Sequence, residues 1–311
     1  MMSDASVWVW GVSLLLALVL APLQLGVIAR VKSYFGGRRG PSVLQWYHDL
    51  WKLLHKESVC SATSAGLVRL APPVGVSSCL CALALLPLGF MDSPLEFTGD
   101  IIVFLYVLGM GRLALVLGAL DTGSSFEGMG ASRELHFSAL AELAIVAVVV
   151  FLVMLTHDYS LGGVLNTAGT EAWRGSGTSL ILIVIALLLV TLAENCRVPF
   201  DDPETHLELT MVHEAMVLDH AGPDLALIHY GAALKLWVFA AFLTTAAVPG
   251  RLFACPWTGL AVHLALVFAV SVVVGVIESA MARYRFLKVP HLLLTASAMA
   301  AMAIFLLEFG G

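Results

Sequence analysis

Four ionisable side chains lie inside long apolar stretches of this 311-residue sequence: Arg112, Glu142, Lys235 and Glu278. Burying one such group in a bilayer costs roughly 2.5–3.5 kcal/mol on insertion scales, so a retained one is a candidate functional group. Carboxylates and a lysine inside a helical bundle are the components of a proton relay, because burial brings their pKa values closer to neutral pH. The alternative is that they form ion pairs that hold helices together. For Glu142 we favour the relay, and for Arg112 the ion pair.

A second group of polar side chains lies between residues 195 and 223. Asp202 is a suitable N-cap for a helix with Pro203 in its first turn, and Gly222-Pro223 is a stop signal, so we expect a helix over 203–221. At 100° per residue, its acidic residues and its histidines would lie on opposite sides: Glu204, Glu208 and Asp219, and His206, His213 and His220. So many polar groups must face water, a protein cavity or a partner subunit.

The sequence does not indicate a site for a metal ion or a nucleotide. Successive histidines are seven residues apart, so their rings would lie roughly 10 Å apart along a helix, too far to bind one ion. We favour proton exchange, or polar contact with a partner. The five cysteines show neither CxxC nor a zinc spacing, so we expect no metal or iron–sulfur cluster in this chain. The sequence also has no P-loop, no GxGxxG and no CxxCH haem motif.

Membrane helices must position these residues. The chain is 59% hydrophobic and only 12% charged, whereas soluble domains are about a quarter charged, so a soluble enzyme is excluded. The net charge of −6 gives no sign of nucleic-acid binding. We expect an all-α integral membrane protein, with eight transmembrane helices in a single domain over residues 1–311. The predicted spans are 7–29, 70–91, 101–120, 135–156, 175–194, 225–248, 252–278 and 289–307.

The basic residues predict the orientation. Twelve of the sixteen Lys and Arg residues fall in or beside the loops after odd-numbered spans, and two fall in loops after even-numbered spans. Because cytoplasmic loops retain basic residues, both termini are expected on the outer side of the membrane.

Besides the segment 195–223, residues 41–57 are expected to be more than a plain connector. In residues 41–57, Leu44, Tyr47, Trp51 and Leu54 recur at helical spacing, which predicts an amphipathic helix at the membrane interface. This helix either anchors the protein to the membrane surface or docks a partner. The glycine-rich segment 121–134 is too irregular for a phosphate site, and we expect a polar loop that folds back on the protein or contacts a cytoplasmic partner.

The segment after the fifth span has the sequence Glu194-Asn195-Cys196-Arg197-Val198-Pro199-Phe200-Asp201. It resembles the E-x-x-R-x-P-F-D signature of membrane subunit 1 of respiratory complex I. Arg39-Gly40-Pro41 in the first loop, and Arg133 with Glu142 nine residues later, are also similar to that family. The resemblance covers nearly the whole chain and implies a multi-pass protein of a prokaryotic inner membrane.

Finer features resemble one branch of this family. Segments 130–134 and 278–285 look like the version found in energy-converting group 4 NiFe hydrogenases, including the formate hydrogenlyase and hydrogenase-4 type. The chain departs from the family pattern at His206, where an acidic residue is usual. The stretch from Glu208 to Asp219 is also longer by about three residues, close to one helical turn, which would reshape a quinone tunnel.

The resemblance implies a docking and proton-coupling subunit of a multisubunit oxidoreductase, with no redox activity or catalytic residue of its own. It would link electron transfer in a cytoplasmic arm to proton or sodium translocation. Its partners would be a hydrogenase-like large subunit, an iron–sulfur small subunit and antiporter-like membrane subunits. The NiFe centre and iron–sulfur clusters would lie in those partners, this chain would hold no cofactor, and a quinone could bind to it.

Together, the resemblance and the charged residues inside the spans assign two groups of site residues. The expected proton pathway consists of Glu142, Glu194, Asp201, Glu204, Glu208, Lys235 and Glu278. Partner docking is expected at Arg39, Arg133, Glu134, Arg197, Asp202, His206 and His213.

Two other functions stay open at this point. One is the quinone-site subunit of a quinone-reducing complex. The other is a free-standing secondary transporter or channel, which intramembrane charges alone also permit. Broken helices in paired positions and an inverted repeat would favour a transporter, and the sequence shows neither.

Overall fold

The computed structural model describes residues 4–59, 64–167, 170–201, 212–248, 253 and 255–309, and no strand occurs among them. Within these ranges, eight helices are long and apolar enough to cross a membrane, as predicted, so the chain is an all-α membrane protein. The elements, with 3-10 turns written as η, are α1 (Asp4–Phe35), α2 (Gln45–Leu54), α3 (Leu67–Leu85), η1 (Leu88–Phe90), α4 (Asp100–Asp121), α5 (Ser125–Thr156), α6 (Leu161–Thr167), α7 (Thr170–Glu194), η2 (Glu214–Val217), α8 (Gly222–Ala247), α9 (Pro256–Ala280), η4 (Phe286–Lys288) and α10 (Val289–Phe309).

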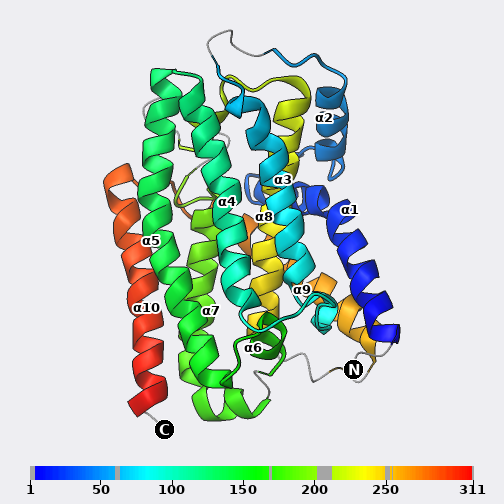
Figure 1. Cartoon of the computed structure of the whole chain (residues 1–311), viewed down its shortest axis with the longest axis vertical. Helices are drawn as coiled ribbons and strands as arrows, with labels where there is room; N and C mark the ends of the chain where they lie inside the picture. Colours follow the sequence, from blue (N-terminus) through cyan, green and yellow to red (C-terminus); the bar gives the residue numbers. More distant parts are fainter. Residues whose placement is uncertain are drawn as a thin grey trace.

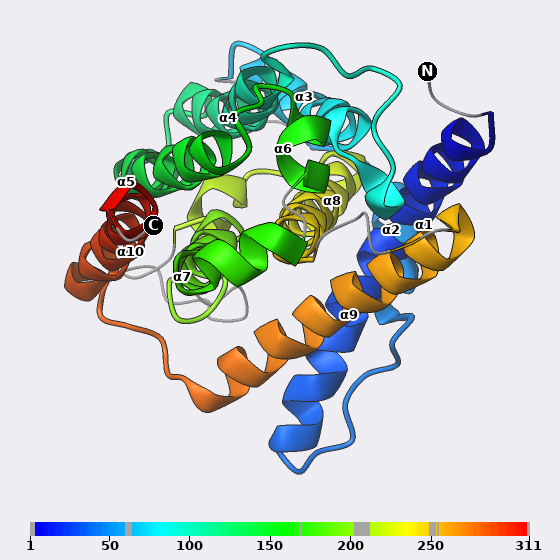
Figure 2. The ribbon, with the colours of Figure 1, turned by 90° about the horizontal axis from the view of Figure 1, so that it is seen from below.

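The spanning helices form a bundle with α7 and α8 at its centre (Figures 1 and 2). Helices α3, α4, α5 and α10 form an arc on one side, and α1 and α9 lie side by side across the other (Figure 2). The sequence of α8 suits this central place, since every residue from Leu236 to Leu243 is apolar, and all of them are buried. The outer helices expose apolar side chains such as Leu113 and Val146, a pattern that suits contact with lipid.

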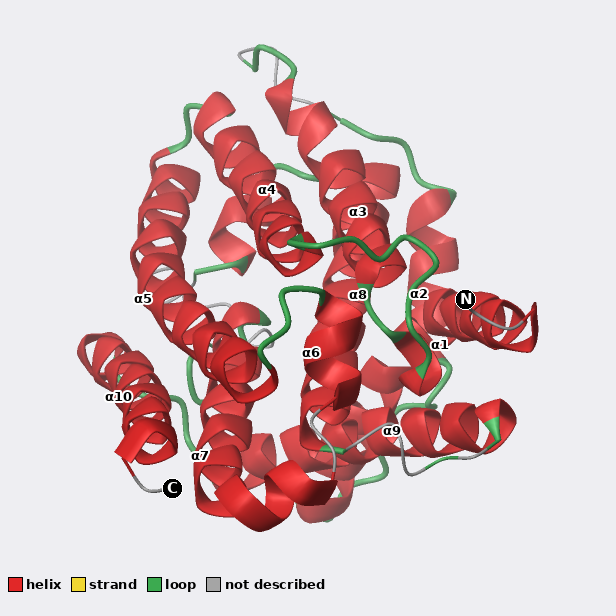
Figure 3. Cartoon of the chain, turned by 60° about the horizontal axis from the view of Figure 1, so that its bottom comes forward, coloured by secondary structure: helices red, strands yellow, loops and turns green. Residues whose placement is uncertain are grey.

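The two ends of the bundle differ in charge. Both termini lie at one end and α2 lies at the other (Figure 1). Helix α6 lies at the end with the termini, which is turned forward in Figure 3. Because consecutive spans alternate in direction, the loops after α1, α4, α7 and α9 all lie at the α2 end. These loops and the helix ends beside them carry twelve Lys and Arg residues. We call this the basic end, and the other the terminal end.

The predicted polar loop over 121–134 is wrong. Helix α4 continues to Asp121 and α5 begins at Ser125, so only residues 122–124 connect them, and α5 starts ten residues before the predicted span. The hydroxyl of Thr122 donates to the carboxylate of Glu127 in the first turn of α5, and Gly123 adopts a left-handed φ of 70°. A carboxylate in a first turn stabilises the helix, which explains why so polar a sequence is helical.

The predicted polar helix over 203–221 does not extend to Ala221. Residues 202–211 lie outside the described residues, and residues 212–221 contain only the single turn η2. The reason is that carboxylates from elsewhere accept backbone N–H groups here: Asp201 binds those of Val212 and His213, and Glu127 binds that of Asp219. Gly222-Pro223, predicted as a stop, instead begins α8, with the proline in its first turn.

The amphipathic helix is present as α2, and none of its residues is buried. Its inner face is attached to the bundle: the hydroxyl of Tyr47 donates to the carbonyl of Val19, and the ring of Trp46 lies 6.0 Å from that of His229. Its outer face exposes Trp51, with 68% of its surface accessible. Such a face suits both a membrane anchor and a docking surface, so both predictions for α2 stand.

Candidate functional site

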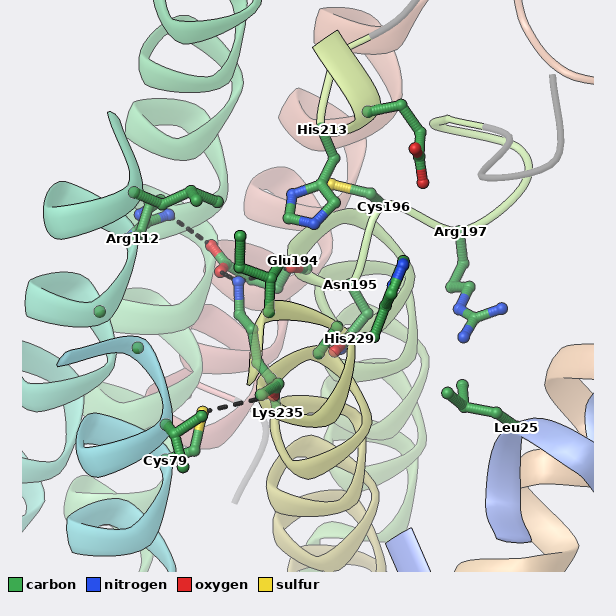
Figure 4. A pocket seen from close by; sticks show the side chains of 18 of the residues that line it. Leu25, Cys79, Arg112, Glu194, Asn195, Cys196, Arg197, His213, His229 and Lys235 are labelled. Atoms are coloured by element: carbon green, nitrogen blue, oxygen red, sulfur yellow. Dashed lines mark hydrogen bonds and ion pairs between the residues drawn. The ribbon is translucent and has the colours of Figure 1, made fainter. Parts of the chain in front are cut away.

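A cavity of about 390 Å³ lies near the basic end, between α1, α3, α4 and α8 (Figure 4). Its wall along α1 and α3 is mostly apolar, with side chains such as Leu25 and Val76. Polar side chains reach it from the C-terminal end of α7, from the loop after α7 and from α8. A concave, largely apolar space with a few convergent polar groups is typical of small-molecule sites.

Glu194 is the centre of the polar wall. One carboxylate oxygen lies 2.7 Å from the guanidinium of Arg112 on α4, and the other lies 2.9 Å from Nζ of Lys235 on α8. These two cations converge on Glu194 from different helices (Figure 4). Glu134 of α5 is buried close by and interacts electrostatically with both cations. The charges of these two carboxylates and two cations thus balance one another. In surroundings of low dielectric constant, the protonation state of each group depends strongly on the charges of the others.

The residues after Glu194 are held in a compact turn. The N–H of Arg197 donates to the carbonyl of Leu192 at 2.9 Å, and the N–H of Cys196 donates to that of Ala193 at 3.1 Å. Cys196 has a left-handed φ of 49°, so these bonds close α7 as a Schellman-type cap. The turn directs Arg197 away from Glu194 (Figure 4), so neighbouring residues of the motif reach different helices.

Three further ion pairs, made by two buried carboxylates, lie beside this turn. Glu278, whose side chain is fully buried at the end of α9, lies 3.4 Å from Arg197 and 3.2 Å from Lys32 of α1. Asp201 lies 2.6 Å from Arg283 in the loop after α9, and its other oxygen accepts the N–H groups of residues 212 and 213. The segment therefore connects α7 to α1, α9 and the polar loop before α8.

His213 and Cys196 line the cavity in uncharged forms. Burial, and to a smaller extent the charges of Lys235 and Arg197, lowers the pKa of His213 to about 4. Burial raises the pKa of the Cys196 thiol well above its ordinary value, and the carboxylate of Glu134 adds to the rise. At pH 7, His213 is therefore a neutral imidazole. The thiol of Cys196 donates to Oε2 of Glu134 at 3.9 Å.

The structure brings most of the described candidate residues together around the cavity. The wall includes five that were predicted for the proton pathway or docking and that belong to α7, its following turn, α8 and α9: Glu194, Arg197, Asp201, Lys235 and Glu278. Glu134 and His213, predicted for docking, also line it, and Glu134 is only 9% exposed. Glu134 therefore belongs to the wall of the cavity and not to an outer surface that a partner could contact.

Other candidates lie elsewhere. Glu142 is exposed on the outer face of α5 and does not line the cavity. Arg39 is exposed in the loop after α1, and Arg133 is half-buried, with its guanidinium 3.1 Å from Sδ of Met129. Four candidates lie outside the described residues: Asp202, Glu204, His206 and Glu208.

Sequence reasoning missed several members of the site. Lys32 and Arg283 were counted only for orientation, yet each pairs with a buried carboxylate. Glu127 was assigned to a loop, yet it is fully buried and accepts the N–H of Asp219 at 3.0 Å. The position of a basic residue at or just after the end of a span could have indicated these pairs, because its side chain can reach a buried carboxylate as well as water. Among the described residues, no group of three or more His, Cys, Asp or Glu side chains could hold a metal ion.

The structure is that of a membrane protein with eight spanning helices among its described residues. Near its basic end is the cavity with a charged wall, which we call the chamber. The sequence matches the family model NADHdh, described as NADH dehydrogenase, over residues 7–309. The chain therefore belongs to this family.

Curated relatives come from both branches of the family. The chain is 33% identical over 291 residues to hydrogenase-4 component C of Escherichia coli (strain K12), covering 92% of this chain and 91% of the relative. It is 33% identical over 283 residues to formate hydrogenlyase subunit 4 of the same organism, covering 88% and 90%. An NADH-quinone oxidoreductase subunit of Phocaeicola vulgatus is 26% identical over 245 residues, covering 76% and 67%.

A solved structure shares the fold. A chain in the structure of the membrane-bound sulfane sulfur reductase, an archaeal respiratory membrane complex, superposes with a TM-score of 0.83 at 19% identity. The superposition covers 97% of this chain and 99% of the other. It supports the eight-helix architecture.

Proposed function

We propose that this chain is the membrane docking and proton-coupling subunit of a complex I-like, energy-converting hydrogenase. It couples electron transfer in a cytoplasmic arm to translocation of protons or sodium ions, and it carries no redox centre itself. The observation that carries the proposal is the pairing of Glu194 with both Arg112 and Lys235 at a cavity near the basic end. Removing or adding one charge there changes the proton affinity of the others, which is the requirement for coupling.

The docking role is supported by the basic end itself. In the proposed orientation this end faces the cytoplasm, both termini face outward, and the whole chain is one transmembrane domain. Exposed Arg39, the outer face of α2 and the exposed residues Leu218 and Asp219 after η2 form the surface offered to a cytoplasmic arm. That arm consists of a hydrogenase-like large subunit with the NiFe centre and an iron–sulfur subunit.

The translocation role is supported by Glu142. It lies 17 residues from the start of α5 and 14 from its end, so it is close to the middle of the span. It is also exposed in this chain, and a carboxylate facing lipid at that depth costs several kcal/mol. We infer that an antiporter-like subunit covers Glu142 and takes protons from it. The proposed pathway runs from Glu194, Lys235, Asp201 and Glu278 through Glu134 to Glu142.

A second candidate is a quinone-site subunit. The apolar wall of the cavity, with His213 and His229 on its polar side, offers a ring-sized space with hydrogen-bonding groups. The relative from Phocaeicola vulgatus, named as a quinone oxidoreductase subunit, belongs to that branch.

Purification of the tagged full chain from native membranes in mild detergent tests the proposal. A stoichiometric large subunit with nickel and iron–sulfur clusters supports it. Isolation of the chain as a lone functional oligomer contradicts it and supports a free-standing transporter. A bound quinone in the cavity, with no nickel in the complex, supports the quinone-reducing alternative.

A further inference from the structure

The buried stripe of α9 carries an unusual set of polar residues. The buried positions of α9 recur every three or four residues along one face, and they include His263, Ser271 and Glu278. Between Thr258 and Glu278, His263 and Ser271 are the only polar residues of this helix. All the polar side chains in the middle of α9 therefore face into the protein and none faces the membrane.

Helix α1 lies against this stripe directly at the basic end, and at the terminal end the turn η1 lies between α1 and α9, with the ring of Phe90 5.3 Å from that of His263. At one end, Lys32 pairs with Glu278 at 3.2 Å. At the other, a Cβ placed on Gly89 would lie 2.8 Å from Oγ of Ser13 and 3.5 Å from Cα of Leu260. The two contacts are 19 residues apart on α1 and 18 residues apart on α9, so the helices run side by side in the same direction.

Polar groups recur along this seam at steps of roughly 10 Å or less. At 1.5 Å per residue, Gln24 lies roughly 12 Å from the height of Lys32, and Ser271 roughly 10 Å from that of Glu278. His263 lies roughly 22 Å from Glu278, and Ser13 is about 6 Å farther toward the terminal end. Each step between polar side chains is short enough for two or three hydrogen-bonded waters.

Several of these groups have no partner in the protein. Within the described spans, buried polar side-chain atoms without a hydrogen bond belong to Gln24, Trp237, His263 and Glu278, which lie on α1, α8 and α9. The Oε2 atom of Glu278 is nevertheless ion-paired with Lys32 at 3.2 Å, so the groups left without a polar partner are those of Gln24, Trp237 and His263. These three helices contact one another, and the ring of Trp237 lies 5.9 Å from that of Phe268 on α9. Both amide atoms of Gln24 and both ring nitrogens of His263 are unpaired.

Neither helix pairing nor a partner subunit explains these residues. Polar residues that join membrane helices do so by hydrogen bonds between them, and Gln24 and His263 make none. Gln24 is 0% exposed and His263 1% exposed, so another protein cannot reach them. An unpaired buried polar group costs about 1–3 kcal/mol, and water is the molecule small enough to satisfy it there.

We propose that the seam between α1 and α9 is a hydrated proton path that connects Glu278 at the cavity with the terminal end of the bundle. Water molecules bound to Gln24, His263, Ser271 and the indole of Trp237 pass protons from one to the next, so that one proton enters the path as another leaves it. The path lies on the opposite side of α8 from Glu142 and gives the chamber its own access to the outer aqueous phase. This inference rests on the proposed coupling function.

Hydration is tested by cysteine accessibility in membrane vesicles that contain the full chain. Gln24→Cys and His263→Cys are treated with a small, positively charged methanethiosulfonate, and the parent chain corrects for native cysteines. Ala296→Cys is the control, because Ala296 on α10 is 0% exposed and buried among apolar side chains. We expect the two seam cysteines to react roughly tenfold faster, or more, than the cysteine at position 296. The reason is that burial without water lowers the thiolate fraction by tenfold for each unit by which it raises the thiol pKa. Equal, slow reaction at all three positions means a dry seam and overturns the proposal.

Conduction is tested in the reconstituted complex. Gln24→Leu and His263→Phe should lose proton translocation per turnover while hydrogen production continues, and His263→Gln should retain more translocation than His263→Phe. Reactive seam cysteines with normal translocation in both apolar variants would overturn the proposal, since the water would then be only structural. A parent complex that translocates no ions would instead contradict the proposed function, so the two failures are distinguishable.

Discussion

Lys235 holds Glu194 in two ways. Its Nζ lies 2.9 Å from a carboxylate oxygen of Glu194 and also donates to the backbone carbonyl of the same residue at 2.6 Å. One side chain of α8 therefore pairs with the buried charge at the end of α7 and satisfies a carbonyl that the helix end leaves free. This double contact joins the electrostatics of the chamber to the position of the following turn.

Substitution of Lys235 by methionine should therefore destabilise the protein as well as stop coupling. Glu194 would keep Arg112 but lose its second cation, and its carbonyl would lose a donor. We expect a loss of roughly 2 kcal/mol, below that for a fully unpaired buried charge, because one ion pair remains. Thermal unfolding of the purified complex, followed by intrinsic fluorescence, measures the loss.

Two variants separate charge from packing in this experiment. Lys235→Arg keeps the charge and should recover part of the stability. The double variant Lys235→Met with Glu194→Gln removes both charges, so it should be less destabilised than the two single variants added together. Strict additivity would show that the two residues do not interact.

Removing the Asp201 carboxylate should loosen the loop before α8. Its oxygens pair with Arg283 and accept the N–H groups of Val212 and His213 at 3.3 and 3.4 Å. A hydrogen bond to a charged group contributes about 1.5–3 kcal/mol, so in Asp201→Ala these amides should exchange roughly 10–100-fold faster. Hydrogen exchange read by mass spectrometry checks this, with peptides from the middle of α8 as the internal control. Unchanged exchange at residues 212–213 would refute the anchoring role.

Acid should destabilise the protein through His213. Its pKa is about 4 in the folded state, below the ordinary 6.5 of an unfolded chain. The unfolded state therefore binds a proton at a higher pH than the folded state does. The stability that this histidine contributes is present above pH 6.5 and is lost as the pH falls from 6.5 toward 4. His213→Gln should reduce the drop in Tm between pH 7.5 and pH 5, whereas His48→Gln on exposed α2 should leave the drop as it was.

Sequence patterns predicted the spans well because lipid imposes a simple rule. About 20 apolar residues are needed to cross a bilayer, and all eight predicted stretches coincide with helices of the structure. Glu194, Arg197 and Asp201, which the motif singled out, all line the cavity. What spacing cannot give is the partner of each residue, because the pairing of Arg197 with Glu278 joins positions 81 residues apart.

The predictions failed where long-range contacts replace local ones. The N–H groups of residues 212, 213 and 219 bind the carboxylates of Asp201 and Glu127, and this removes donors that a helix would have used. No local pattern around residue 219 indicates Glu127, which is 92 residues away. The pathway role of Glu142 stays a prediction: its place in an apolar stretch indicated the membrane, but not that it lies on the exposed side of α5.

Glu142→Gln should abolish ion translocation while the complex stays assembled. Glutamine keeps the size and polarity of the side chain but cannot give up a proton at neutral pH. Dye-quench measurements of proton uptake in vesicles, normalised to hydrogen production, check this prediction. A glutamate-to-glutamine change at exposed Glu57 is the matched control and should have no effect on the ratio. Full translocation in Glu142→Gln would remove this residue from the pathway.

Two glycines of α5 offer a paired test of how tightly the loop of residues 212–221 packs against this helix. A Cβ on Gly130 would lie 2.9 Å from both the Cβ of Ala215 and the backbone carbonyl oxygen of Val212, so the loop with η2 must move to admit it. A Cβ on Gly128 meets nothing within 4 Å. We expect Gly130→Ala to cost about 1–3 kcal/mol by overpacking. Gly128→Ala should add about 0.4–1 kcal/mol by restricting the unfolded chain. Comparison of Tm values checks both, and a stabilising Gly130→Ala would show that this loop does not pack on α5 as described.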